Sequence, residues 1–123
     1  MSSYKVLFVD AGILRDSISS RLRSSGFEVL EARTGLEGLE KAISGLPSAI
    51  ILNYDLKGLT GPELAKKLKD NSLTRNIPLI GCSNCEWLAP DDSNLETQLE
   101  YSDVSALLDA LTILELDEKL PKF

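Results

Sequence analysis

Two polar residues stand directly after apolar runs, at positions where side chains often do chemistry. Asp10 follows residues 4–9 (YKVLFV), and Asn53 follows residues 49–52 (AIIL). Such runs are typical of strands buried on both faces of a parallel sheet. Ligands of open α/β sheets bind just past the carboxyl ends of the strands, so we expect Asp10 and Asn53 to face one crevice. Asp10 either caps the following helix or holds a cation, whereas the neutral amide of Asn53 is best suited to hydrogen bonding.

A second group of reactive residues, Cys82 and Cys85, follows the apolar run at residues 77–81 (IPLIG). A C-x-x-C pair after a strand of an α/β domain can be redox-active, especially at a helix N-terminus, where the thiolate is stabilised. The alternative is a purely structural role for both residues. Zinc needs four nitrogen or sulfur ligands, and with two cysteines and no histidine in the chain we expect no metal site. Ser83 is expected at the rim of the crevice.

Strand and helix patterns alternate along the chain and position these residues. Strands are predicted at residues 4–9, 27–32, 49–52, 77–81 and 95–99, and helices at residues 13–25, 34–44, 60–70 and 102–114. Alternation with short links predicts a parallel sheet with right-handed crossovers and helices on both faces. The expected fold is a flavodoxin-like, doubly wound α/β fold with five strands in the order 2-1-3-4-5. It forms a single domain over residues 1–123, with a core at about 4–114 and a helix end and tail at 115–123.

Helix ends and inner faces follow from local signals. Thr34 and Thr60 are expected N-caps, Pro62 lies in a first turn, and Gly26 is an expected C-cap. The apolar residues expected on the inner faces of the second and last helices are Leu36, Leu39, Ala42 and Ile43, and Val104, Leu107, Leu108, Leu111 and Leu114. The link between the fourth and fifth strands contains Pro90 and two aspartates, so its helix is expected to be shortened or missing.

Composition excludes several classes of function. The chain has 123 residues, 43% of them hydrophobic and 26% charged, which is ordinary for a soluble globular domain. Its net charge is −6 and it has no basic cluster, so a nucleic-acid surface is not expected. No apolar run approaches the roughly 18 residues of a membrane span, and the start is too short and too polar for a signal peptide. We therefore expect a cytoplasmic protein.

The motifs carry a resemblance to a known family. The runs VLFVD, GFEVLEA, TGLEGLEKA, PSAIILNYDLKGLTGPEL and IPLIGCS, within residues 5–83, resemble the CheY-like receiver domains of response regulators in two-component signalling. The resemblance implies a phosphoryl group accepted by an aspartate at the end of the third strand. It also implies Mg²⁺ held by paired acids after the first strand, and a lysine and a Ser or Thr hydroxyl that hold the product.

This chain departs from the receiver pattern at most of those positions. Asn53 stands where the phosphoacceptor aspartate belongs, and an amide cannot form the acyl phosphate. Asp10 matches one of the paired acids, but Ala11 replaces the other. Ser83 matches the hydroxyl position. Leu99, or the glutamate after it, stands at the lysine position.

No Lys or Arg occurs between Arg75 and Lys119, so the lysine is absent in any register of the fifth strand. The resemblance is therefore to a degenerate receiver, or pseudo-receiver, with no cofactor and with Mg²⁺ binding weak or absent. We expect no enzymatic activity. The expected function is phosphorylation-independent binding of another signalling protein by a monomer or weak dimer.

Partner contacts are predicted at Trp87, Leu88 and Tyr101. The receiver resemblance implies that Tyr101 stands near the position of an aromatic residue that moves in working receivers. One alternative is a redox-responsive regulator that uses Cys82 and Cys85. Another is a working receiver with unusual acceptor chemistry. For that role Asp55 is a weak candidate, because it belongs to a solvated loop.

Overall fold

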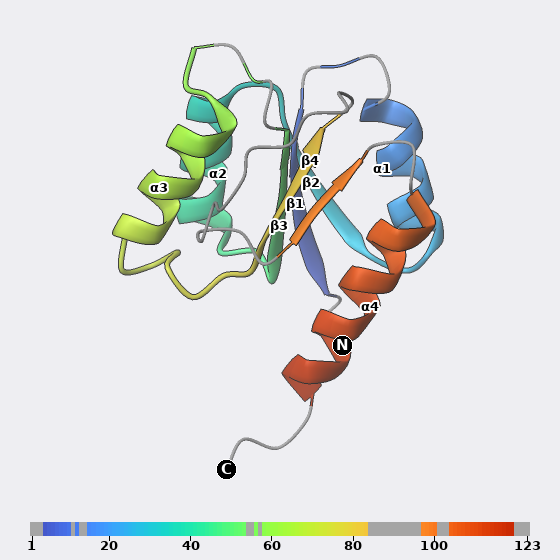
Figure 1. Cartoon of the computed structure of the whole chain (residues 1–123). Coiled ribbons are helices and arrows are strands. Elements are labelled where there is room, and N and C mark those ends of the chain that lie inside the picture. Colours follow the sequence, from blue (N-terminus) through green and yellow to red (C-terminus); the bar gives the residue numbers. More distant parts are fainter. Residues whose placement is uncertain are drawn as a thin grey trace.

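The sheet has five parallel strands in the predicted order. The computed structural model describes residues 4–10, 12, 15–53, 56, 58–83, 97–100 and 104–119. The strands are β1 (Lys5–Val9), β2 (Glu28–Ala32), β3 (Ala49–Asn53), β4 (Leu79–Ser83) and β5 (Thr97–Glu100). They pair side by side as β2-β1-β3-β4-β5 (Figure 1). This confirms the flavodoxin-like arrangement, with β1 and β3 as central neighbours.

Among the described residues, two helices cover each face of the sheet. The helices are α1 (Arg15–Ser24), α2 (Gly35–Gly45), α3 (Gly61–Asp70) and α4 (Val104–Lys119). Figure 1 shows α1 and α4 on one side of the sheet and α2 and α3 on the other. Side chains of β3 alternate between the two resulting cores. Ile51 packs in the α1/α4 core, and Ile50 and Leu52 pack in the α2/α3 core. All three are fully buried, as predicted for a central parallel strand.

The predicted caps are confirmed where the structure describes them. Thr34 accepts a hydrogen bond from the Glu37 N–H at 3.0 Å and begins α2. Thr60 and Glu63 form a reciprocal capping box, with Pro62 in the first turn of α3. The Thr60 hydroxyl and then its backbone N–H lower the pKa of Glu63. The resulting stabilisation is present above the unfolded-state pKa and is lost as pH falls through the folded-state value.

One predicted inner-face residue is wrong. Leu36 is 59% exposed, whereas Ala42 is fully buried and Leu39 packs partly against the core. The reason is that α2 packs Gly38 against β1 and Gly35 against Leu59, which lies in the loop before α3. A Cβ at Gly38 would lie 2.8 Å from a Val9 methyl carbon, so the glycine allows the helix to approach β1 closely. Leu36 is thereby rotated out of the interface.

The same contact geometry gives a stability prediction for α2. A Cβ on Gly35 would overlap the backbone carbonyl oxygen of Leu59, whereas one on Gly45 would meet only the end of the Leu30 side chain at 3.1 Å. Gly35→Ala is therefore expected to lower the free energy of unfolding by about 1–3 kcal/mol. Gly45→Ala, the matched control, should be neutral or stabilising by up to about 1 kcal/mol. Urea titrations of both variants provide the measurement, and equal effects would contradict this account of the α2 approach.

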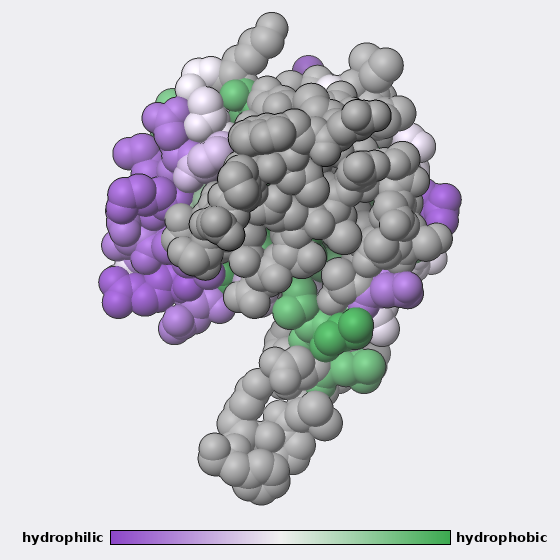
Figure 2. Space-filling view, viewed as in Figure 1, coloured by the Kyte–Doolittle hydropathy of each residue, from purple (hydrophilic) through white to green (hydrophobic). Residues whose placement is uncertain are grey.

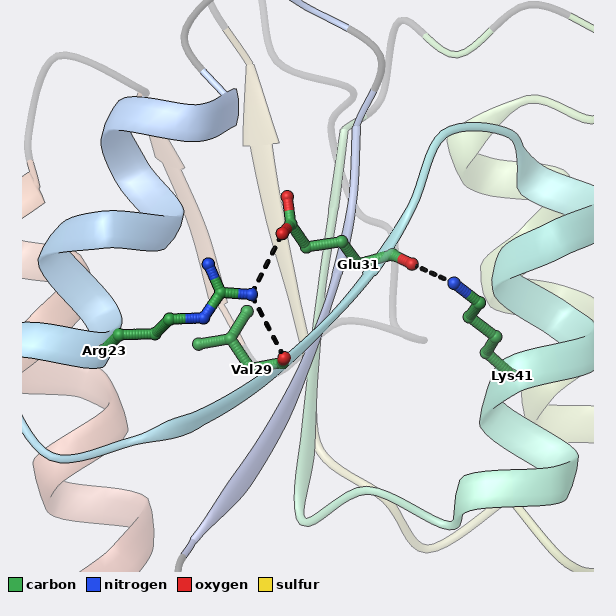
Figure 3. Close-up of polar contacts among 4 residues, drawn as sticks. All are labelled: Arg23, Val29, Glu31 and Lys41. Atoms are coloured by element: carbon green, nitrogen blue, oxygen red, sulfur yellow. Dashed lines mark hydrogen bonds and ion pairs between the residues drawn. The ribbon is translucent and has the colours of Figure 1, made fainter.

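The edge strand β2 accepts hydrogen bonds from side chains of the helices on both sides. The Arg23 guanidinium on α1 donates to the Glu31 carboxylate at 3.0 Å and to the Val29 carbonyl at 3.4 Å. On the other face, the Lys41 ammonium on α2 donates to the Glu31 carbonyl (Figure 3). Charged side chains and occupied carbonyls make an edge strand a poor template for pairing with another chain. The contacts therefore protect this edge.

The last third of the chain is described only in part. β5 confirms the predicted fifth strand to within two residues, and α4 extends the predicted last helix to Lys119. The prediction of a shortened or missing helix between β4 and β5 falls on residues 84–96, outside the described residues. Within the described part of the chain, no helix is both long and apolar enough to cross a membrane.

Candidate functional site

The carboxyl ends of three neighbouring strands bring the predicted site residues to one edge of the sheet. Asp10 directly follows β1, Asn53 ends β3, and Ser83 ends β4. Val9 pairs with Leu52, and Asn53 pairs with Cys82, so the three strand ends lie at nearly the same level. β1 and β3 flank the point where the strand order reverses, which is where ligands bind in such sheets.

Asp10 and Asn53 are in direct contact. The Asn53 side-chain amide donates to the Asp10 Oδ1 at 2.9 Å, and the Gly12 backbone N–H donates to the same oxygen at 3.0 Å. Asp10 is fully buried and Asn53 is 8% exposed. Hydrogen bonds to an ionised carboxylate are among the stronger ones in proteins, and burial strengthens them further. Asn53 therefore acts as a structural partner of Asp10.

The contact with Gly12 clarifies the role of Asp10. An Asp side chain that accepts the N–H two residues ahead closes an Asx turn. This turn lies in the loop between β1 and α1, and α1 begins at Arg15. The backbone N–H of Asp10 itself donates to the Ala32 carbonyl on β2 at 2.9 Å. Hydrogen bonds of Asp10 thus connect the start of this loop to β2, through Ala32, and to β3, through Asn53.

Mg²⁺, which the receiver resemblance implies, does not fit the described residues. Asp10 is a single carboxylate, and its Oδ1 is occupied by two N–H donors. Its Oδ2 is buried and has no hydrogen-bond partner among the described residues. Mg²⁺ keeps several bound waters and wants one or two accessible carboxylates. No group of three or more His, Cys, Asp or Glu side chains that could hold a metal occurs in the described part of the chain.

Of the remaining predicted site residues, the structure describes some and not others. Leu99 lies in β5 opposite Cys82, which lies in β4. None of the four β5 residues is basic. Six residues of the predictions lie outside the described residues: Ala11, Asp55, Cys85, Trp87, Leu88 and Tyr101. The redox pair and the predicted partner surface therefore stay predictions.

Sequence comparison relates the chain to response regulators, although no family model matches it. PhoB, the phosphate regulon transcriptional regulatory protein of Pseudomonas aeruginosa, is 35% identical over 71 residues, which are 58% of this chain and 31% of PhoB. DivK, the polar-differentiation response regulator of Brucella ovis, is 37% identical over 59 residues, 48% of each chain. The matches span under half the length of these relatives.

Structural comparison extends the likeness over nearly the whole chain. The chemotaxis response regulator CheY4 of Vibrio cholerae superposes with a TM-score of 0.80 and 26% identity, covering 92% of this chain and 99% of CheY4. The chain is therefore similar, in sequence and in fold, to the receiver domains of response regulators. Asn53 is the last residue of β3, the strand end at which the receiver resemblance implies the phosphoacceptor.

Sequence reasoning missed one participant at the site, the backbone N–H of Gly12. An Asp two residues before a Gly, at the end of a predicted strand, is a recognised turn signal and could have indicated it. The direct contact between Asp10 and Asn53 was anticipated only as a shared crevice. The structure shows the Asn53 amide hydrogen-bonded directly to the Asp10 carboxylate.

Proposed function

We propose that this receiver does not accept a phosphoryl group at residue 53 and acts as a phosphorylation-independent protein–protein interaction module. One observation carries the proposal: the buried hydrogen bond from the Asn53 amide to the Asp10 Oδ1, 2.9 Å long. Phosphoryl acceptance needs an anionic oxygen at residue 53, and an amide offers a neutral oxygen and a donor. The donor stabilises Asp10 in place of a cation.

The charge around the site supports the proposal. Phosphoryl transfer depends on cations that neutralise the charge developing on the phosphoryl oxygens. The chain has no Lys or Arg between Arg75 and Lys119, so neither β4, β5 nor the link between them supplies one. A phosphoryl group beside the buried Asp10 carboxylate would add negative charge without compensation.

A receiver that is not phosphorylated can transmit a signal only by how much of it is available to bind its partner. A ligand shifts a conformational equilibrium only by its differential affinity for the two states. Without phosphorylation that differential term is missing, so partner binding is set by one surface and by the concentration of the chain. The partner we propose is another cytoplasmic signalling protein, and the chain itself carries no enzymatic activity.

The proposal predicts that small phosphodonors leave the protein unmodified. The purified chain is incubated with acetyl phosphate and Mg²⁺, and its intact mass is measured by mass spectrometry. No increase by one phosphoryl group is expected, while a receiver that carries the aspartate serves as positive control in the same buffer. Beryllofluoride with Mg²⁺ should likewise leave the tryptophan emission unchanged.

A stable phosphoryl adduct on the wild-type chain would overturn the proposal. Mapping by peptide mass spectrometry would then identify the acceptor. An adduct on Asp55 would support the alternative of a working receiver with unusual acceptor chemistry.

A further inference from the structure

Helix α4 carries apolar side chains on two opposite faces. Leu111 is fully buried in the α1/α4 core, with Leu108 and Leu114 packed partly against it. Ile113 is 65% exposed and Leu116 is 56% exposed. Residues of an α-helix are spaced about 100° apart, so Ile113 lies about 200° around the axis from Leu111. The exposed pair therefore lies on the side of α4 that faces away from the sheet.

A surface helix normally presents polar residues on its outer side. Helix α3 follows this rule, since its exposed residues include Glu63, Lys66, Lys67 and Asp70. Figure 2 shows the contrast, with a hydrophilic surface over α3 and a hydrophobic area over α4. The C-terminal half of α4 also extends beyond the sheet (Figure 1). Exposed aliphatic side chains thus occupy part of the outer side of α4, where polar residues are the norm.

The other exposed aliphatic residues do not form such a stripe. Leu36 lies in the first turn of α2, Leu46 is its C-cap, and Leu73 lies in the loop after α3. Single exposed aliphatic side chains are normal on protein surfaces. Ile113 and Leu116 are three residues apart and are neighbours on one helix face, which makes them a contiguous apolar stripe.

The charges of α4 indicate which partner would fit the stripe. The helix contains four acidic residues and one lysine, a net charge of −3 within a chain of net charge −6. Asp109, one turn before Ile113, is exposed, and Glu115 adjoins Leu116. Pairing with a second copy of α4 would bring like charges together, and an anionic membrane would repel the same residues. A partner with basic residues beside its apolar face is complementary.

We propose that Ile113 and Leu116 form a docking stripe for an amphipathic helix of a partner protein, with basic residues flanking the apolar residues of that helix. An amphipathic helix laid along an apolar stripe is a recurring mode of recognition, with anchors spaced as i and i+3 or i+4. Two aliphatic side chains supply only part of the roughly 800 Å² per partner of a stable interface, so the contact is a transient one. This inference rests on the proposed function only in that the chain acts by binding a protein.

The experiment uses two synthetic amphipathic helical peptides, one of leucine and lysine and one of leucine and glutamate. Their binding to the full chain is measured by fluorescence anisotropy at physiological ionic strength. The Leu/Lys peptide should bind the wild-type chain. The double variant Ile113→Gln/Leu116→Gln should bind this peptide with an affinity that is lower by about tenfold or more. Leu73→Gln, at an equally exposed leucine, is the matched control and should change nothing, since all three proteins have the same charge.

Several outcomes would overturn the docking stripe. One is that the wild-type chain binds the two peptides equally well. Another is that the double variant binds the Leu/Lys peptide as well as the wild type does. A third is that the wild-type chain binds anionic vesicles and the double variant does not. Self-association lost in the double variant, seen by sedimentation, would assign the stripe to a second copy. An unchanged thermal midpoint shows that the double variant is folded. The phosphoryl mass assay on the same protein separates the two proposals. If the Leu/Lys peptide does not bind and no phosphoryl adduct forms, the docking stripe is refuted and the proposed function is not.

Discussion

Asn53→Asp is expected to lower the free energy of unfolding at pH 7 by about 2 kcal/mol or more, without making the protein phosphorylatable. The substitution replaces the amide that donates to Asp10 Oδ1 with a second carboxylate at the same place. Both positions are nearly inaccessible to water, so the repulsion is weakly screened. Under the proposed function the site lacks the second acid and the lysine that the receiver resemblance implies, so the new carboxylate alone is not expected to rebuild it.

The loss of unfolding free energy caused by Asn53→Asp should increase as pH rises from acidic values. Burial and the neighbouring negative charge raise the pKa of the new carboxyl group above its unfolded value of about 3.9. At pH below that unfolded value the group is protonated in both states and the repulsion is absent. As pH rises through the interval up to the folded-state pKa, the unfolded state loses its proton first, so the destabilisation grows and then stays constant.

Urea unfolding of Asn53→Asp and wild type at pH 7 and at mildly acidic pH measures this difference. Asn53→Ala is the control, because it removes the amide without adding a charge. The gap between the two variants at pH 7 then reports the repulsion. A variant as stable as wild type at pH 7 that also gains a phosphoryl group from acetyl phosphate would show that the pocket is intact apart from residue 53.

Much of the fold could be predicted because local signals and the hydrophobic pattern agree. The run before Asn53 has no polar residue, and both faces of β3 are buried. Thr60 and Pro62 mark the start of α3 independently of its apolar face. Because parallel strands end at one edge, the meeting of Asp10 and Asn53 follows from strand order alone. These features depend on short-range sequence and on topology.

What could not be predicted depends on contacts between elements. Leu36 fits an apolar helix face, but the approach permitted by Gly35 and Gly38 sets the rotation of α2. The Asp10 Oδ1 accepts from both the Asn53 amide and the Gly12 N–H, and the second contact depends on the turn after β1. On α4, apolar residues occur on both sides, and their pattern does not say which side meets the sheet. Only the packing of Leu111 decides that Ile113 faces outward.

Leu111→Ala is expected to lower the free energy of unfolding by about 2–5 kcal/mol, whereas Ile113→Ala should change it by no more than about 0.5 kcal/mol. Leu111 is fully buried between α4 and the sheet, so its truncation leaves a cavity, while Ile113 is 65% exposed. The two residues lie in the same helix, two positions apart, so differences in helix propensity contribute little to the contrast. Urea titration with unchanged m-values is the measurement. If Ile113→Ala cost as much as Leu111→Ala, the outer side of α4 would already be covered within the chain, and no free stripe would remain for a partner helix.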